Sequence, residues 1–167
     1  MQQAPEGGFA GRTNKLVDAC YSWWVGGCWS LIEASTQRSP TTEPIWNRRT
    51  SHYTLLDRLL GALAKYLLAC CQHQDGGLRD KPSMRADFYH TLYSLAGLSA
   101  TQYHYMYDQK ATKMEGDGDE SAFKWRPSDF VEGEEGDRVG MVHPVFVLPW
   151  GDAERMRSWF VKKGEKV

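Results

Sequence analysis

The sequence contains an internal repeat that begins at two pairs of adjacent glycines. When Gly7-Gly8 is aligned with Gly76-Gly77, 69 residues later, similar residues follow at matching positions. The matched pairs are Phe9 with Leu78, Arg12 with Lys81, Asp18 with Asp87, Cys20 with Tyr89, Tyr21 with His90 and Trp24 with Tyr93. Self-similarity over so long a period is typical of arrays in which each unit, here a glycine loop and two helices, stacks on the next. Because equivalent positions in neighbouring units face the same space, we expect Asp18, Cys20 and His90 to meet at one point.

The composition favours a single globular domain and excludes several classes of protein. The 167 residues are 41% hydrophobic and 25% charged, which is enough for one domain with a core, spanning residues 1–167. A net charge of −1 gives no general attraction to nucleic acid. The longest apolar run is interrupted by Asp18, so we expect no transmembrane segment, which needs about 20 mostly apolar residues. Four cysteines without a disulfide spacing and no signal peptide at the N-terminus predict a cytoplasmic protein.

The first segment of helical periodicity is apolar on nearly every side. The pattern predicts a helix that Thr13 or Asn14 caps and that runs to about Ala34. Its buried stripe is expected to include Leu16 and Val17. A helix that is apolar nearly all round is typical of an inner helix enclosed by others.

Two further segments have the same helical spacing. The pattern predicts a second helix over residues 52–71, with leucines along one face. A third helix is predicted to begin at a cap formed by Asp87 and to continue to about Tyr107. The order of glycine loops and helices therefore predicts an all-α array of helical hairpins.

The C-terminal third has a different pattern. Residues 109–138 have no periodicity, and acidic residues and glycines dominate them, which predicts a solvated, flexible acidic insertion. Residues 142–148 are predicted to be extended because Pro144 disfavours helix in the residue before it. Asp152 is predicted to cap a short last helix through Phe160.

The candidate chemistry centres on Asp18, Cys20 and His90. In a regular helix, residues two apart point about 200° apart, so Asp18 and Cys20 reach one ion only where the helix is distorted or begins. A lone Asp-x-Cys pair is more often a cap and a buried thiol, and a lone histidine is more often a satisfied polar residue. The repeat favours a site, because it places His90 one position from the register of Cys20. A carboxylate, a thiolate and an imidazole form a three-ligand zinc set that leaves a fourth position open for substrate.

Charged and aromatic residues surround these three. Arg12 and Lys15 precede the first predicted helix, where basic side chains beside the helix N-terminus suit a phosphate or diphosphate; alternatively, they are solvated loop charges. Several aromatic residues are candidates either for the core or for the wall of an apolar ligand pocket. They are Trp23, Trp24, Trp29, Tyr89 and Tyr93.

At this point the sequence resembles a known family. The segments GGFAGRTNKLVDACYSWW and GGLRDKPSMRADFYHTLYSLAGLS resemble the two matching segments of protein farnesyltransferase β subunits, and CCQHQDGG and HPVF follow in the family's order. The GGF-x-GR, D-x-C-YS-W and histidine elements are shared with geranylgeranyltransferase β subunits, whereas the CCQ run, residues 76–82 and residues 87–90 favour the farnesyl enzymes. The resemblance implies an α/α barrel (α/α toroid) of helical-hairpin repeats, of which this chain corresponds to the C-terminal portion.

The resemblance also implies roles for individual residues. It implies that Asp18, Cys20 and His90 hold a catalytic zinc, that Arg12, Lys15 and Tyr21 contact the diphosphate, and that Asp80 holds magnesium on the diphosphate. Trp24, Tyr89 and Tyr93 are implied to line the isoprenoid and peptide site. The family usually has more basic residues than this chain has at residues 83–86, so no basic contact is expected there.

The implied reaction is zinc-dependent farnesyl transfer from farnesyl diphosphate to the cysteine of C-terminal CaaX motifs, such as those of small GTPases. The implied partner is the farnesyltransferase α subunit, and we expect no activity from the chain alone, because its apolar helices need neighbours. Geranylgeranyl transfer is the nearest alternative. A non-catalytic helical-repeat scaffold that binds a protein, which has no reason to hold metal, and an α/α-barrel terpene cyclase, which needs an acidic catalytic motif, are the alternatives from other classes.

Overall fold

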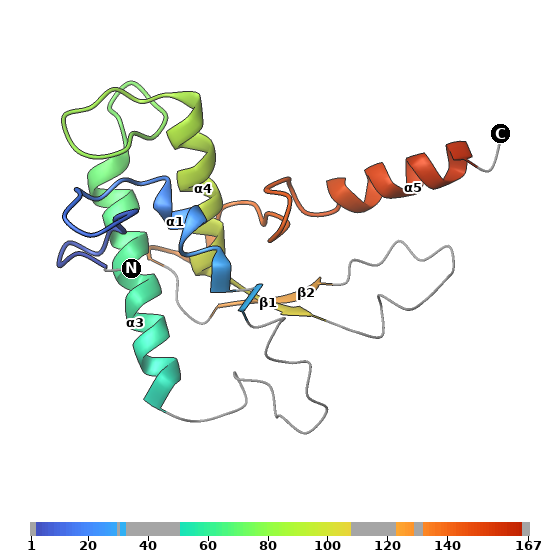
Figure 1. Ribbon diagram of the computed structural model, residues 1–167, viewed down its shortest axis with the longest axis horizontal. Coiled ribbons are helices and arrows are strands. Elements are labelled where there is room, and N and C mark those ends of the chain that lie inside the picture. The colour runs from blue at the N-terminus through green and yellow to red at the C-terminus, as the bar shows by residue number, and fades with distance from the viewer. Residues whose placement is uncertain (1–2, 30, 33–50, 108–122, 129–131, 165–167) are drawn as a thin grey trace.

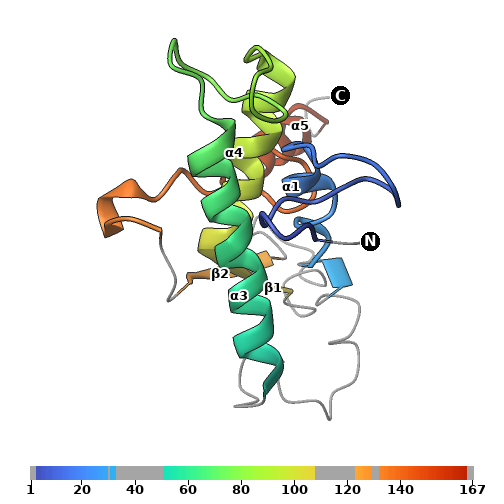
Figure 2. The same cartoon turned by 90° about the vertical axis from the view of Figure 1, so that its left-hand side faces the viewer.

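The structure, a computed structural model, describes residues 3–29, 31–32, 51–107, 123–128 and 132–164. Helices α3 and α4 lie side by side, and the short α1 packs against α4 (Figure 1). Turned by 90°, the same arrangement shows α1 on one flank of the α3 and α4 pair, near the N-terminus (Figure 2). The described elements, in chain order, are α1 (Tyr21–Trp24), α3 (Ser51–Tyr66), a π-helical turn (Leu67–Cys71), α4 (Phe88–Gln102), β1 (Tyr103–Tyr107), β2 (Phe123–Pro127), a 3-10 turn (Glu135–Asp137) and α5 (Asp152–Gly164).

The two glycine loops have the same backbone hydrogen bonds. The Gly7 N–H donates to the Ala4 carbonyl at 2.8 Å, and 69 residues later the Gly76 N–H donates to the His73 carbonyl at 3.0 Å. The φ angles of these two glycines are 96° and 94°, a region that residues with a side chain rarely adopt. Isolated bridges join Gln3 to Phe9 and Gln72 to Leu78, and the N–H groups of Asp18 and Asp87 donate to the carbonyls of Phe9 and Leu78. The predicted repeat is therefore confirmed at the level of individual hydrogen bonds.

The predicted start of the first helix is wrong, because the helix begins later in the chain. A helix from residue 13 or 14 would direct the N–H groups of residues 18 and 19 to carbonyls four residues back. Instead the Asp18 N–H donates to the Phe9 carbonyl at 3.1 Å and the Ala19 N–H to the Asp80 carbonyl at 2.8 Å. These long-range bonds keep residues 15–18 out of a helix, so α1 begins at Tyr21 and has four residues. Leu16, expected in the buried stripe, is 75% exposed. The predicted end at Ala34 lies outside the described residues.

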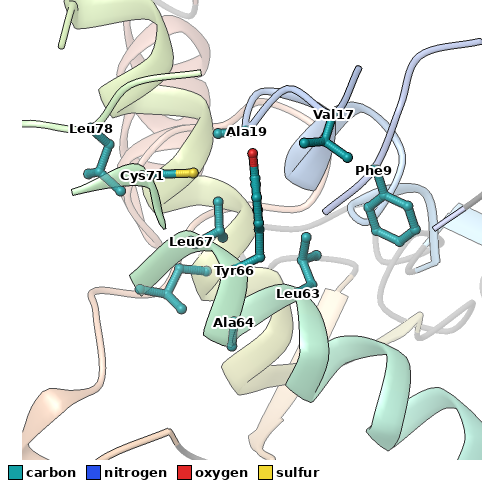
Figure 3. Packing of buried hydrophobic residues seen from close by; sticks show 10 residues of the cluster. Phe9, Val17, Ala19, Leu63, Ala64, Tyr66, Leu67, Cys71 and Leu78 are labelled. Carbon is teal, nitrogen blue, oxygen red and sulfur yellow. The ribbon is translucent and has the colours of Figure 1, made fainter. Parts of the chain in front are cut away.

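The second predicted helix is confirmed. α3 begins at Ser51 and continues directly into the π-helical turn that ends at Cys71. Leu63 and Leu67 are almost completely buried where this helix faces the two glycine loops. The core cluster is centred there (Figure 3), and it consists of Phe9, Val17, Ala19, Leu63, Ala64, Tyr66, Leu67, Cys71, Leu78 and Leu98.

The third predicted helix begins as expected and ends earlier. The side chain of Asp87 accepts a hydrogen bond from the His90 N–H at 2.8 Å and caps α4, which confirms the predicted start. The helix ends at Gln102 rather than near Tyr107, because alternate tyrosines follow and this spacing of two suits a strand. The hydroxyl groups of Tyr103 and Tyr105 donate to the carbonyls of Val139 at 3.0 Å and Val142 at 2.7 Å.

The acidic segment contains structure that the sequence pattern missed. β2 pairs antiparallel with β1, with Tyr105 opposite Trp125. Arg138 then closes this region, since its guanidinium donates to the carbonyls of Gln102 at 2.8 Å and Ser128 at 2.7 Å. Residues 108–122 and 129–131 lie outside the described part of the chain, so the acidic insertion stays a prediction there.

The segment predicted to be extended forms a turn instead. The His143 N–H donates to the Leu148 carbonyl at 2.7 Å, and the Val147 N–H returns to the His143 carbonyl at 3.1 Å. The Nδ1 atom of His143 accepts the Val145 N–H at 3.1 Å, so the buried imidazole holds the turn from within. α5 begins at Asp152, runs past the predicted end at Phe160 and extends away from the other helices (Figure 1). Among the described residues, no helix combines the length and apolar character needed to cross a bilayer.

The contact between α1 and α4 leaves no room for a side chain at Gly97. A Cβ atom there would overlap the Ser22 side chain and come within 2.8 Å of the Ser22 carbonyl carbon. We expect Gly97→Ala to lower the free energy of unfolding by about 1–3 kcal/mol, the usual cost of overpacking. Urea unfolding of the complete protein checks this. Gly140→Ala is the control, since a Cβ atom there meets nothing within 4 Å, and a smaller loss for Gly97→Ala than for this control would contradict the tight contact.

Candidate active site

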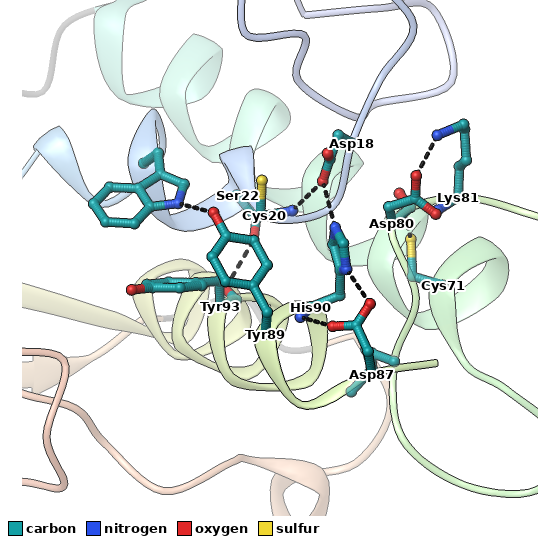
Figure 4. A network of polar contacts seen from close by, with 12 residues as sticks. Asp18, Cys20, Ser22, Cys71, Asp80, Lys81, Asp87, Tyr89, His90 and Tyr93 are labelled. Carbon is teal, nitrogen blue, oxygen red and sulfur yellow. Dashed lines mark hydrogen bonds and ion pairs between the residues drawn. The ribbon is translucent and has the colours of Figure 1, made fainter. Parts of the chain in front are cut away.

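Asp18, Cys20 and His90 meet at one place, as the repeat predicted (Figure 4). One ligand atom from each lies within 4.8 Å of the other two. Cys20 directly precedes α1, and His90 lies in the first turn of α4, which brings together segments that are far apart in the sequence. Asp18 lies in the stretch before α1, where its carboxylate accepts the Cys20 N–H at 2.9 Å. The helical geometry that would separate Asp18 from Cys20 therefore does not arise.

A second carboxylate orients the imidazole of His90. The Oδ2 atom of Asp87 lies 2.7 Å from His90 Nδ1, and its Oδ1 atom accepts the His90 N–H. The backbone N–H and the imidazole of His90 lower the pKa of Asp87, so this carboxylate stays ionised. A proton on Nδ1 leaves the Nε2 lone pair free, and Nε2 lies 3.4 Å from the Asp18 carboxylate. A carboxylate behind a histidine is the usual outer partner of a metal-binding imidazole.

The surroundings of Cys20 favour a cation. Burial, followed by the hydrogen bond and the negative charge of Asp18, raises the pKa of this thiol to about 12. The protein alone therefore keeps Cys20 protonated, although a thiolate is the form that binds metal. A divalent cation between Asp18 and His90 would reverse this balance, because a coordinated thiol loses its proton. The three donors are also the nitrogen, sulfur and oxygen ligands that zinc takes.

The predicted aromatic wall is assembled beside the three donors. The rings of Trp24 and Tyr93 have centroids 4.7 Å apart, and the same distance separates Tyr89 from Tyr93. The indole N–H of Trp24 donates to the Tyr89 hydroxyl at 3.1 Å. Trp24 is 46% exposed and Tyr89 is 49% exposed, so these rings form a surface rather than a closed core. In contrast, Trp23 is buried, and Trp29 is 43% exposed.

A hollow of about 750 Å³ opens on the other side of Asp18. Arg12, Lys15 and Tyr21 line it. The resemblance implied that these three residues contact a diphosphate, and this role stays a prediction. Arg12 lies in a bend and Lys15 in the non-helical stretch of residues 15–18, so the prediction that they stand directly before a helix N-terminus is wrong. Lys81 also lines the hollow and was not among the predicted site residues, although the repeat register places it on Arg12.

Asp80 lies next to this hollow with its carboxylate already paired. One oxygen is in contact with the Lys81 ammonium group, and the other accepts the Lys81 N–H at 2.9 Å. Asp80 is not among the three donors that share the candidate metal position. A second cation at Asp80 would therefore have to compete with Lys81.

Comparison with known proteins identifies the family. Residues 1–148 match the family model described as "Prenyltransferase alpha-alpha toroid domain", so the chain belongs to this family. The all-α class expected from the sequence is thereby confirmed, with the short β1–β2 hairpin as an addition.

Individual relatives refine the resemblance. The chain is 42% identical to "Protein farnesyltransferase subunit beta" of Pyricularia oryzae, with 97% of this chain and 30% of that protein covered. It is 39% identical to the protein of the same name from Schizosaccharomyces pombe, with 93% and 35% covered. It is also 33% identical to "Geranylgeranyl transferase type-2 subunit beta" of Saccharomyces cerevisiae, with 61% and 25% covered. The resemblance to farnesyltransferase β subunits is confirmed, and the chain spans about a third of the length of the first two relatives.

Asp87 should matter to metal binding in addition to its role as a helix cap. Asp87→Ala removes both contacts to His90. Asp87→Ser keeps an oxygen that can cap the helix, but the serine side chain is too short to reach the imidazole. We expect both variants to bind divalent zinc or cobalt about 10–100-fold more weakly, the usual effect of losing an outer partner. Competition with a chromophoric chelator measures this affinity. Wild-type affinity in Asp87→Ser would show that the cap alone orients His90.

Proposed function

We propose that the protein carrying this chain transfers a farnesyl group from farnesyl diphosphate to the cysteine of C-terminal CaaX motifs, including those of small GTPases. In this proposal the chain is part of the catalytic β subunit of a cytoplasmic heterodimer with a farnesyltransferase α subunit. The observation that carries it is the meeting of three metal donors with a cationic hollow on one side and an aromatic wall on the other. The similarity to farnesyltransferase β subunits supports the choice of substrate.

Asp18, Cys20 and His90 are the residues that would hold zinc. Their donor atoms fit the ion, and the burial and the Asp18 carboxylate that raise the pKa of the Cys20 thiol favour a cation at this point. When bound, zinc would supply a Lewis acid that holds the substrate thiol as a thiolate at neutral pH. Asp87 keeps the His90 imidazole in the required orientation. Nearby, the rings of Trp24, Tyr89 and Tyr93 offer an apolar surface for the isoprenoid and for the peptide.

The cationic hollow would bind the leaving group. In the proposed reaction a bond forms between the thiolate sulfur and carbon 1 of the farnesyl chain while the bond from that carbon to the diphosphate oxygen breaks. The diphosphate leaves with the electron pair, and the thiol proton passes to solvent. Arg12, Lys15 and Lys81 line the hollow and would stabilise the negative charge that builds on the diphosphate, with a hydrogen bond from Tyr21.

Asp80 is the proposed magnesium residue, in agreement with the resemblance. Its carboxylate lies beside Lys81, which reaches the hollow, so an ion held there would lie at the edge of the diphosphate. Binding of the diphosphate would draw the Lys81 ammonium away and leave the Asp80 carboxylate to the metal. This exchange explains why a carboxylate stands beside a site for an anion.

Geranylgeranyl transfer remains the second candidate, because one of the relatives is a geranylgeranyltransferase β subunit. Both reactions would use the same donors and the same hollow. Competition between the two isoprenoid diphosphates for one CaaX peptide decides between them.

The zinc proposal predicts a clear difference between two cysteines. We expect Cys20→Ala to reduce zinc affinity at least about 100-fold, because a ligand is lost rather than an outer partner. Cys28→Ser should leave affinity unchanged, since the Cys28 thiol bonds only the Trp24 carbonyl among the contacts described. Elemental analysis of the purified complex, followed by chelator titration, measures both. Equal zinc content in wild type and Cys20→Ala would falsify the assignment, and a lack of zinc in both would favour a non-catalytic scaffold.

The magnesium proposal predicts the effect of charge at residue 80. We expect wild-type transfer to be stimulated by magnesium and Asp80→Lys to be largely independent of it, because a lysine ammonium can neutralise the diphosphate without a metal. Asp80→Asn is the matched control: it removes the carboxylate without adding a positive charge, so it should stay slow at every magnesium concentration. A wild-type rate that does not change in a magnesium titration would contradict this role and favour the geranylgeranyl alternative.

A further inference from the structure

The main-chain carbonyl of Asp80 is a junction between the two repeat units. It accepts the Ala19 N–H at 2.8 Å and the Tyr66 hydroxyl at 3.4 Å, and the Cys71 thiol lies 4.0 Å away. Ala19 stands between Asp18 and Cys20 in the first unit, whereas Asp80 belongs to the second. This one carbonyl therefore links the segment of Asp18 and Cys20 to the Asp80–Lys81 pair beside the hollow.

Tyr66 is the side chain that touches both units at this junction. Its ring packs closely against the first glycine loop, since a Cβ atom on Gly8 would lie 2.9 Å from the ring. Its hydroxyl points toward Ala19 (Figure 3) and donates to the Asp80 carbonyl of the second loop. The residue is 3% exposed, and burial followed by the neighbouring Cys71 raises the pKa of Tyr66, so the hydroxyl remains a donor.

The loop after Asp80 has little other support. Pro82, Ser83, Met84 and Arg85 are exposed, and the Met84 N–H makes a long contact of 3.4 Å to the Lys81 carbonyl. Ser83 has a φ angle of 70°, a conformation that the loop must hold without help from a glycine. The start of this loop is therefore held by the two donors on the Asp80 carbonyl and by the Arg79 N–H, which donates to the Cys71 carbonyl at 2.9 Å.

We infer that Tyr66 is a positioning residue of the transfer reaction: its hydroxyl holds the Asp80 carbonyl and so fixes the Asp80–Lys81 pair relative to Asp18 and Cys20. This inference rests on the proposed function for its catalytic consequence. Its structural part is that the Tyr66 hydroxyl donates to the same Asp80 carbonyl as the Ala19 N–H, and this part depends only on the geometry. Tyr66 itself does not line the hollow and acts only through the main chain of Asp80.

The test compares two tyrosines in the complete enzyme with its partner subunit. Tyr66→Phe removes the hydroxyl and keeps the ring against Gly8. Tyr105→Phe is the matched control, because Tyr105 is equally buried at 4% exposure and its hydroxyl also donates to a carbonyl, that of Val142, at 2.7 Å. A general loss of stability would affect both variants, whereas a loss of positioning affects only Tyr66→Phe.

The first measurement is hydrogen exchange at the Ala19 amide, which needs no activity. We expect Tyr66→Phe to exchange this amide roughly two- to tenfold faster, the factor that corresponds to losing one hydrogen bond, and Tyr105→Phe to match wild type. The second measurement is a magnesium titration of farnesyl transfer. We expect the half-saturating magnesium concentration of Tyr66→Phe to rise by a similar factor, with kcat at saturating magnesium unchanged within about twofold.

The outcomes separate the inference from the proposed function. Wild-type exchange at Ala19 in Tyr66→Phe, or equal changes in Tyr66→Phe and Tyr105→Phe, overturns the positioning role. Faster exchange with an unchanged magnesium titration overturns its catalytic part. An absence of transfer in wild type counts against the proposed function, while the exchange measurement still decides whether Tyr66 holds the junction.

Discussion

The hydrogen bond from the Ala19 N–H to the Asp80 carbonyl is the contact on which the site depends. It joins two segments that are distant in sequence. It also gives the Ala19 N–H a partner outside the local chain, whereas a helix would direct this N–H to a carbonyl four residues back. This is the reason that α1 is short and that Asp18 lies before it rather than within it. Asp18 and Cys20, on either side of Ala19, can therefore both lie near His90. Tertiary packing here overrides the helical preference of the local sequence.

The repeat gives two aspartates equivalent backbone roles and different chemical roles. Asp18 and Asp87 occupy matching positions, and each accepts a backbone N–H a few residues further along, at 2.9 Å and 2.8 Å. The imidazole of His90 lies between them, with Nδ1 facing Asp87 and Nε2 facing Asp18. One aspartate thus becomes a candidate ligand and the other the partner that orients the histidine. A duplicated turn can supply both parts of a metal site without any new loop.

Much of the site could be predicted from the sequence, because the repeat register carries long-range information. The register placed Asp18, Cys20 and His90 together, and helical spacing located the second helix and the cap at Asp87. Secondary-structure boundaries that depend on segments outside the repeat were missed. Neither the strand partner of residues 103–107 nor the turn around His143 leaves a periodic signal in the sequence. The turn depends on an imidazole that accepts backbone N–H groups, and the strand depends on a partner 20 residues away. Such contacts are specific to tertiary structure, so local spacing does not reveal them.

The three candidate donors come together at different stages of folding. Asp18 and Cys20 are close in sequence, so these two candidate donors lie near each other even before the protein folds. His90 joins them only when α4 has docked, because its place is set by contacts between the two units. A bond from His90 to an ion would therefore report tertiary order directly. In a cobalt-substituted protein, the visible spectrum would distinguish a chain that has merely captured the ion from one that has completed its fold.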